Sequence, residues 1–173
     1  MMYEYNQAIS KMDEFKAEVQ VLIPVLQAAR AELGEERANR LILGALRAWC
    51  RERFKHMGAR IPGTPREKWD AIKKLDGART RDHDLEFSIL KWEPEAIEYD
   101  VSRCLYAELF RELGEPELGA VLVCDSDLYL VEQVTGTEVE YTRTQSIMEG
   151  GSVCDIRWRI KNHGEAKAKC ADR

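Results

Sequence analysis

The chain has 173 residues, of which 45% are hydrophobic and 33% are charged, and its formal net charge is −5. This length and composition are typical of one globular domain, which we expect over residues 1–161. The negative net charge leaves no surplus of positive charge to neutralise nucleic-acid phosphates. The most apolar stretch, residues 19–29, is interrupted by two glutamines and a proline and is too short to cross a bilayer. These features exclude nucleic acid and a membrane as expected partners.

The first residues are partly acidic and contain no apolar core of a signal peptide, so we expect a cytoplasmic protein. The cysteines are odd in number and widely spaced, which is not the pattern of a disulfide framework. Because the chain has neither a CxxC pair nor an HExxH motif, the sequence predicts no metal site and no other cofactor. The five cysteines are Cys50, Cys104, Cys124, Cys154 and Cys170.

Apolar residues at helical spacing predict two long helices in the first third of the chain, over residues 10–33 and 35–57. Gly34 is placed to cap the first helix, and Gly58 to end the second. Thr64 and Glu67 are spaced as a capping box around Pro65, which predicts a short helix to about Leu75. We expect a polar loop over residues 76–84.

The rest of the chain mixes strand and helix patterns. We expect a strand over residues 85–92, a helix over 101–113 capped by Asp100, and a helix over 116–134. Two β-rich runs, 137–148 and 152–161, are joined by Glu149-Gly150-Gly151 and predict an antiparallel hairpin. Residues 162–173 have no apolar anchor, and we expect a disordered tail there. The predicted fold class is α+β, with N-terminal helices packed on a small antiparallel sheet that ends in a C-terminal β-hairpin.

Alternation along the predicted hairpin separates its two faces. On the last strand Cys154, Ile156 and Trp158 point inward, and on the preceding strand Arg143 and Gln145 are assigned to the same inward face. An arginine aimed at a core needs a partner, so Arg143 is a candidate for binding a substrate carboxylate. The alternative is an edge position where Arg143 reaches solvent or pairs with a protein carboxylate.

Cys124 opens the run Cys-Asp-Ser-Asp, which puts two carboxylates in the middle of an otherwise apolar predicted helix. A buried carboxylate whose pKa is raised can act as a general acid or base, and Asp127 is the candidate. Cys104 is expected to be buried on the preceding helix. The alternative for each cysteine is an inert core residue, because cysteine is among the residue types most often simply buried.

The order of several segments resembles the L-2-amino-thiazoline-4-carboxylic acid hydrolase family. The resemblance covers the C-terminal part of the chain before the tail. It is carried by Cys104 and the helix after it, Arg111–Gly119 (RELGEPELG), Val123–Asp127 (VCDSD), Arg143-Thr144-Gln145 and Gly150–Arg157 (GGSVCDIR).

This resemblance implies a cytoplasmic small-molecule hydrolase of cysteine biosynthesis, which opens a cyclic carbon–nitrogen bond in a carboxylate-bearing amidine and yields a carbamoyl-cysteine. Such chemistry needs either a water activated by a carboxylate or a cysteine nucleophile. The positions that match the family's pattern are Cys104, Cys124, Asp127, Cys154 and Asp155. To these positions we assign the roles ourselves, with Cys104 or Cys154 as nucleophile and Asp127 as base. Arg143, Gln145, Cys124 and Asp155 are the expected substrate-binding residues.

A weaker resemblance links the helix, the glycine turn and the late cysteine to the vinyl-reductase-type ligand-binding modules. It implies a non-catalytic module that binds a small molecule or a metal-containing ligand. Both interpretations make a small molecule the partner, and both leave a homodimer open.

Overall fold

The computed structural model describes residues 11–79, 84–136 and 139–161, so the tail expected at 162–173 lies outside the described residues. The chain divides into two compact units, residues 1–46 and 47–173, which are described separately below. The expectation of one domain over 1–161 therefore stays a prediction. Within the described part of the chain, no helix is long and apolar enough to cross a membrane.

The first unit contains α1 (Lys11–Leu33) and the beginning of α2 (Glu35–Arg60). Gly34 separates the two helices with a φ of 80°, a conformation in which glycine is not strained. Its amide donates to the carbonyl of Arg30 over 3.0 Å, and Arg30 Nε donates to Asn39 Oδ1 over 2.8 Å. Both predicted helices and the cap between them are confirmed.

The second unit begins within α2, which continues past Gly58 to Arg60, so the prediction that Gly58 ends the helix is wrong. Gly58 serves a different purpose there, because a Cβ atom on it would lie 2.5 Å from the carbonyl oxygen of Gln133. The capping box before α3 (Pro65–Arg79) is present, since the amide of Thr64 donates to Glu67 Oε2 over 2.6 Å. The prediction that a loop begins at residue 76 is wrong, because α3 extends to Arg79. Residues 80–83 of the expected loop lie outside the described residues.

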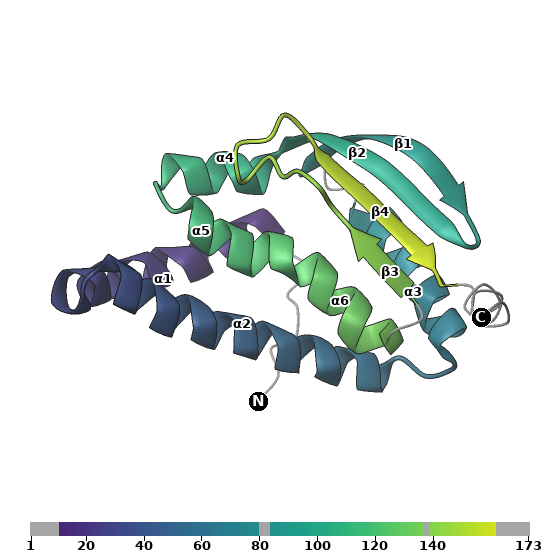
Figure 1. Ribbon diagram of the computed structural model, residues 1–173, viewed down its shortest axis with the longest axis horizontal. Coiled ribbons are helices and arrows are strands. Elements are labelled where there is room, and N and C mark those ends of the chain that lie inside the picture. Colours follow the sequence, from purple (N-terminus) through teal and green to yellow (C-terminus); the bar gives the residue numbers. More distant parts are fainter. Residues whose placement is uncertain (1–10, 80–83, 137–138, 162–173) are drawn as a thin grey trace, which may run out of the picture. The chain divides into compact units, whose positions relative to one another are not determined.

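A four-stranded antiparallel sheet is the centre of the second unit (Figure 1). Its strands are β1 (Leu85–Glu93), β2 (Ala96–Cys104), β3 (Val139–Thr142) and β4 (Cys154–Ile160), in the order β1-β2-β4-β3. The predicted C-terminal hairpin and the α+β class are confirmed. The predicted helix start at Val101 is wrong, because Asp100 lies within β2 and accepts a hydrogen bond from Arg157 of β4 over 2.7 Å instead of capping a helix.

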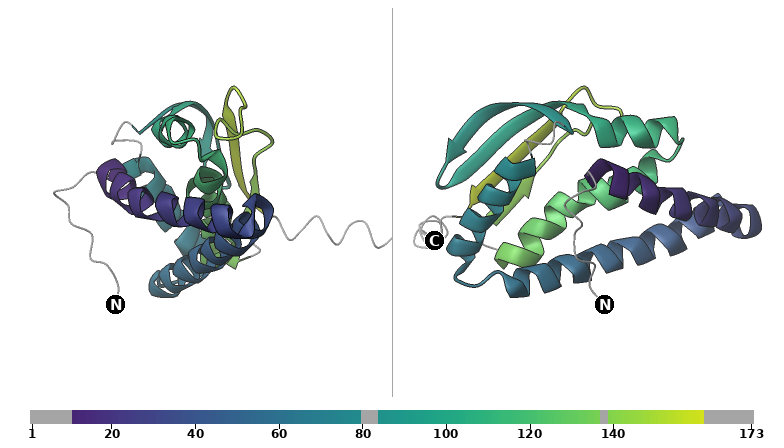
Figure 2. Two further views of the ribbon diagram at one scale, coloured as in Figure 1. Left: turned by 90° about the vertical axis from the view of Figure 1, so that its left-hand side faces the viewer. Right: turned by 180° about the vertical axis from the view of Figure 1, so that it is seen from behind.

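The two faces of the sheet differ in chemistry. Helix α3 lies against the inner face, where the rings of Trp69 and Trp158 are 5.6 Å apart (Figure 2). The outer face carries ion pairs that join β2 to β4, including Arg159 to Glu98 at 2.6 Å. The alternation predicted for β4 is therefore confirmed. The buried inner residues of β2 and β4 are Ile97, Tyr99, Val101, Cys154, Ile156 and Trp158.

The helical segment between β2 and β3 consists of α4 (Leu105–Glu112), α5 (Pro116–Gly119), the π-helical turn η2 (Ala120–Cys124) and α6 (Asp125–Thr135). The extent of the helix predicted over 116–134 is confirmed, but the sequence pattern does not predict its π-helical turn. Gly119 allows a close approach, since a Cβ atom there would lie 2.6 Å from both the Phe110 ring and Met148 Sδ. The segment thereby brings Cys124 and Asp127 close to the sheet.

Candidate functional site

Six chemically active side chains gather in the second unit, each within electrostatic range of at least two of the others. Five of them are site residues predicted from the sequence, and the structure brings these together although up to 50 residues separate them. Cys104 ends β2, Cys124 ends η2, and Asp127 lies in the first turn of α6. Below, "the cluster" denotes Cys104, Cys124, Asp127, Tyr141, Arg143 and Cys154.

Three members of the cluster, Cys124, Tyr141 and Arg143, line an open pocket of about 460 Å³. Its wall combines one end of α6 with the end of β3 and the residues that follow it. The lining residues are Cys124, Asp125, Leu128, Tyr141, Thr142, Arg143 and Thr144. Because the pocket is open and about the volume of a small organic molecule, a ligand can reach part of the cluster from solvent.

Arg143 is the cation of the cluster. Its Nη1 donates to the carbonyl oxygen of Cys124 over 3.2 Å, and the side chain is half-buried. Burial acts to lower the pKa of Arg143, but Tyr141, Cys124 and Asp127 outweigh it, so the pKa is raised and the guanidinium stays charged. This arrangement gives the pocket a fixed positive charge that suits an anionic ligand group.

The buried thiols of Cys104 and Cys124 are held in their neutral form. Burial raises the pKa of Cys124 to about 12, against a smaller opposing effect of Arg143. Burial likewise raises the pKa of Cys104, although the amides of Ala107 and Tyr106 act in the opposite direction. Cys104 occupies the N-cap position of α4, but its side chain makes no capping hydrogen bond. Both groups are therefore mainly thiols at neutral pH.

Cys154 is fixed by the backbone. It is buried at the start of β4, and its Sγ accepts a hydrogen bond from the amide of Ile147 over 3.2 Å. That contact comes from the connection between β3 and β4, residues 143–153. The same connection therefore positions both Arg143 and Cys154.

Tyr141 and Ser146 belong to this site, although the sequence pattern predicts neither of them as a site residue. The hydroxyl oxygen of Tyr141 is buried and has no hydrogen-bond partner among the described residues. Ser146 is only 2% exposed, and its Oγ lies 3.8 Å from Cys124 Sγ. If the strand continued past Thr142, alternation would place Ser146 on the outer face. Because β3 ends at Thr142, alternation does not apply to Ser146. For Tyr141, the sequence signal that could have indicated a site residue is its inward position close to Arg143.

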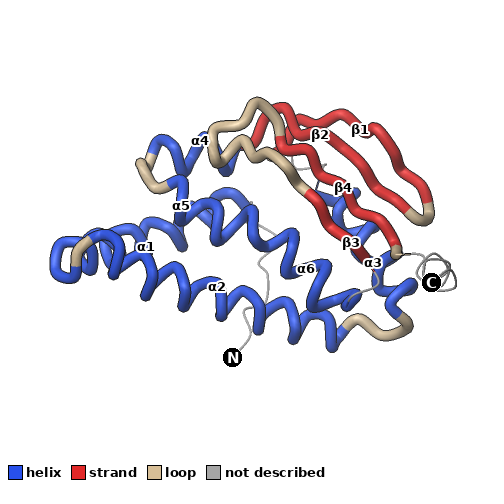
Figure 3. Tube along the Cα trace, viewed as in Figure 1, coloured by secondary structure: helices blue, strands red, loops and turns tan. Residues whose placement is uncertain are grey.

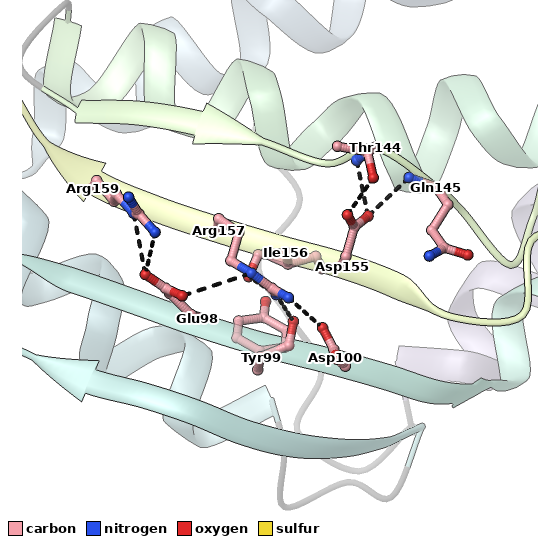
Figure 4. Close-up of polar contacts among 9 residues, drawn as sticks. All are labelled: Glu98, Tyr99, Asp100, Thr144, Gln145, Asp155, Ile156, Arg157 and Arg159. Atoms are coloured by element: carbon pink, nitrogen blue, oxygen red, sulfur yellow. Dashed lines mark hydrogen bonds and ion pairs between the residues drawn. The ribbon is translucent and has the colours of Figure 1, made fainter.

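Two further predicted site residues, Gln145 and Asp155, lie near Thr144 and do not belong to the cluster (Figure 4). Gln145 is exposed, so its inward assignment is wrong, because β3 ends at Thr142 and strand alternation does not hold beyond it. Asp155 accepts hydrogen bonds from the amides of Thr144 and Gln145, each over 2.8 Å, and from the Thr144 hydroxyl. Neither residue lines the pocket, and Asp155 instead anchors the residues directly after Arg143.

The connection between β3 and β4, drawn in tan near α4 in Figure 3, is stabilised by hydrogen bonds within itself and by one to α4. The amide of Gly151 donates to the carbonyl of Ser146 over 2.8 Å, and Gly150 adopts a φ of 94°. Arg111 of α4 donates to the carbonyl of Ile147. These contacts stabilise the 143–153 connection, whose residues Arg143 and Thr144 line the pocket.

A metal centre has no support in this part of the molecule. In the three described ranges, no group of three or more His, Cys, Asp or Glu residues is arranged to hold a metal ion. The three cysteines and Asp127 of the cluster are thus neighbours without forming a ligand set.

Comparison with known proteins identifies the family. The family model described as L-2-amino-thiazoline-4-carboxylic acid hydrolase matches residues 14–158. No curated protein matches the chain. Among solved structures, the phenol-responsive sensory domain of the transcription activator PoxR with phenol is similar, at 14% identity and a TM-score of 0.41, covering 86% of this chain and 79% of that one. This likeness is too distant to inform the fold or the ligand. Since the family match spans most of the chain and every residue of the cluster, the chain belongs to the L-2-amino-thiazoline-4-carboxylic acid hydrolase family.

Proposed function

We propose that this protein hydrolyses a small cyclic amidine that bears a carboxylate, with L-2-amino-thiazoline-4-carboxylate as the test substrate. One observation carries the proposal: Arg143 and Cys124 line an open pocket, and Asp127 and Cys154 lie within electrostatic range of both. Membership of the family supports the substrate class. A cytoplasmic location, a homodimer and a role in cysteine biosynthesis belong to the same proposal.

Substrate binding is assigned first to Arg143. Its guanidinium is held by the Cys124 carbonyl through Nη1 and carries further N–H groups. A carboxylate accepts two of these in a planar pair, which fixes both the position and the orientation of the ring. The amidine end of the substrate carries N–H donors, which suit the carboxylate of Asp127.

The reaction consumes one water. Asp127 removes a proton as the water oxygen bonds to the ring carbon that carries the amino group, while the electron pair of the C=N bond moves to the ring nitrogen, which takes up that proton. The tetrahedral carbon then forms the C=O bond and releases one ring atom, and the remaining hydroxyl proton passes through Asp127 to the atom that leaves. Sulfur is the weaker base of the two ring atoms and leaves more readily. Cleavage therefore gives N-carbamoyl-cysteine with a free thiol, which revises the carbon–nitrogen cleavage expected from the sequence.

Activated water is favoured over a cysteine nucleophile. Only a thiolate attacks carbon efficiently, and burial keeps the pKa of Cys104 and Cys124 raised. In this mechanism Cys124 shapes the pocket that it lines and does not attack the substrate. Cys154 is the remaining nucleophile candidate, because its sulfur lies at the start of β4 with one backbone donor on it.

The same neutral thiols favour a second candidate function, a non-catalytic ligand-binding module. A pocket whose thiols are protonated can bind a small molecule without reacting with it. The two functions differ in one observable, because a binding module forms a complex with the thiazoline carboxylate and returns it unchanged.

Product analysis tests the proposal. Purified protein is incubated with L-2-amino-thiazoline-4-carboxylate in water enriched in oxygen-18, and free thiol and product mass are followed together. We expect one thiol and one labelled oxygen for each ring opened. Release of an amine with no thiol would show carbon–nitrogen cleavage, whereas binding without turnover would support the second function.

A further inference from the structure

Two buried polar atoms in the sheet lack hydrogen-bond partners among the described residues: the Tyr141 hydroxyl and Trp158 Nε1. They belong to residues that lie directly opposite each other in the β3–β4 pairing. Their rings are 6.3 Å apart and tilted by 59°. The two atoms therefore belong to one region of the inner face.

A buried polar group without a partner lowers stability, and most buried polar groups in proteins have one. Each exception calls for an explanation, and a ligand that supplies the missing partner is one of the physical possibilities. Trp158 is 0% exposed, contacts Trp69 on α3, and does not line the pocket. Tyr141 does line the pocket, so of the two residues it is the one that a ligand can approach.

The surroundings of Tyr141 define the kind of ligand group. Arg143 lies two residues further along the chain and lines the same pocket. A phenol hydroxyl can donate a hydrogen bond, and a guanidinium only donates. Two neighbouring donors match a group that only accepts, and a carboxylate is such a group.

We propose that the hydroxyl of Tyr141 donates a hydrogen bond to the substrate carboxylate, beside the guanidinium of Arg143. This inference rests on the proposed function and adds to it a recognition residue in the role that strand alternation assigns to Gln145. Arg143 keeps its Nη1 contact with the Cys124 carbonyl and binds the same carboxylate through its other N–H groups. The opposite end of the ring is then directed toward Asp127.

The protonation state of Tyr141 agrees with this role. Burial, followed by the nearby charge of Asp127, raises its pKa, while Arg143 opposes the shift. The phenol therefore stays protonated throughout the physiological pH range. Tyr141 is a constant donor and not a general base.

The substitution Tyr141→Phe tests the inference because it removes only the hydroxyl. Binding is measured by calorimetry with two probes, L-2-amino-thiazoline-4-carboxylate and the saturated L-thiazolidine-4-carboxylate, which lacks the amidine carbon and cannot be hydrolysed in the same way. We expect both probes to bind about ten- to hundredfold more weakly, the usual loss of one hydrogen bond to a charged group. The midpoint of thermal unfolding should stay the same or rise, since an unpaired buried hydroxyl is removed.

Tyr129→Phe is the matched control, because Tyr129 is a buried tyrosine of α6 that does not itself line the pocket. Unchanged binding in this control and weaker binding in Tyr141→Phe would support the inference. Wild-type affinity in Tyr141→Phe, or a clear fall in its unfolding midpoint, would overturn it while leaving the hydrolase proposal intact. Tyr141-dependent binding without any hydrolysis would support the inference and contradict the hydrolase. Failure of the wild type to bind either probe would overturn both.

Discussion

Among single residues, Asp155 illustrates how a side chain outside the pocket can set the geometry within it. Its carboxylate accepts hydrogen bonds from Thr144 and Gln145, the two residues directly after Arg143. Burial acts to raise the pKa of Asp155, but the hydrogen bonds from Thr144 and Gln145 outweigh it and the pKa is lowered. The ionised form is thus the one that holds this part of the wall.

We expect Asp155→Ala to lower the free energy of unfolding by about 1 kcal/mol at neutral pH, a modest value because the group is close to solvent. A lowered native pKa gives stability that is present above the ordinary aspartate pKa of about 3.9 and is lost as pH falls through the native pKa. The difference between wild type and variant should therefore shrink below about pH 4. Urea unfolding at several pH values measures this, and a difference that grows in acid would contradict the assignment.

Residue types and order are enough to predict five of the six residues in the cluster. Cysteines and carboxylates inside apolar patterns are conspicuous in a sequence, and Arg143 follows a strand pattern. Tyr141 cannot be selected in this way. A buried tyrosine gives the same sequence pattern whether or not its hydroxyl has a hydrogen-bond partner. Ser146 escapes prediction because its burial comes from the turn that returns the chain to β4, which alternation does not describe.

Among the helices and strands, the junction between α5 and η2 depends on glycine. A Cβ atom on Gly119 would lie 2.6 Å from the Phe110 ring and from Met148 Sδ, so α5, α4 and the 143–153 connection meet at this point. Helix α2 offers a contrast, because a Cβ atom on Gly44 would meet no neighbouring atom within 4 Å. The same substitution should therefore have opposite effects at the two sites.

We expect Gly119→Ala to lower the free energy of unfolding by about 1–3 kcal/mol through overpacking. Gly44→Ala should raise it by about 0.5–1 kcal/mol, since alanine favours the helix interior. Chemical denaturation of both variants measures the two values. Equal effects of the same sign would show that the close approach at Gly119 is not a determinant of stability.

Helix and strand predictions are correct where local pattern and tertiary environment agree. The capping box of α3 and the inward face of β4 are examples. They fail at β2, where Asp100 resembles a helix cap, because its actual partner is Arg157, 57 residues away. The π-helical turn that ends at Cys124 has no local sequence signature, and such turns are frequent at functional sites.

In the molecule as a whole, every residue of the cluster belongs to the second unit, residues 47–173, while the family match runs through both units. The sheet supplies Cys104, Tyr141 and Cys154, and the helical segment supplies Cys124 and Asp127. The site therefore exists only when a strand pairing and a helix packing form together. The family and the fold class can be predicted from the order of the residues. The meeting of the sheet and the helical segment at the cluster can be seen only in the three-dimensional structure.

In the mechanism proposed here, the cluster opens a cyclic amidine by means of carboxylate-activated water. The most direct measurement is kcat/KM for L-2-amino-thiazoline-4-carboxylate in wild type and in Asp127→Asn, with Glu132→Gln, an exposed residue on the same helix, as the control. We expect about a hundredfold or greater loss in Asp127→Asn, the usual contribution of a general base, and no loss in Glu132→Gln. Wild-type turnover in a folded Asp127→Asn variant, or no turnover by the wild type, would contradict this mechanism.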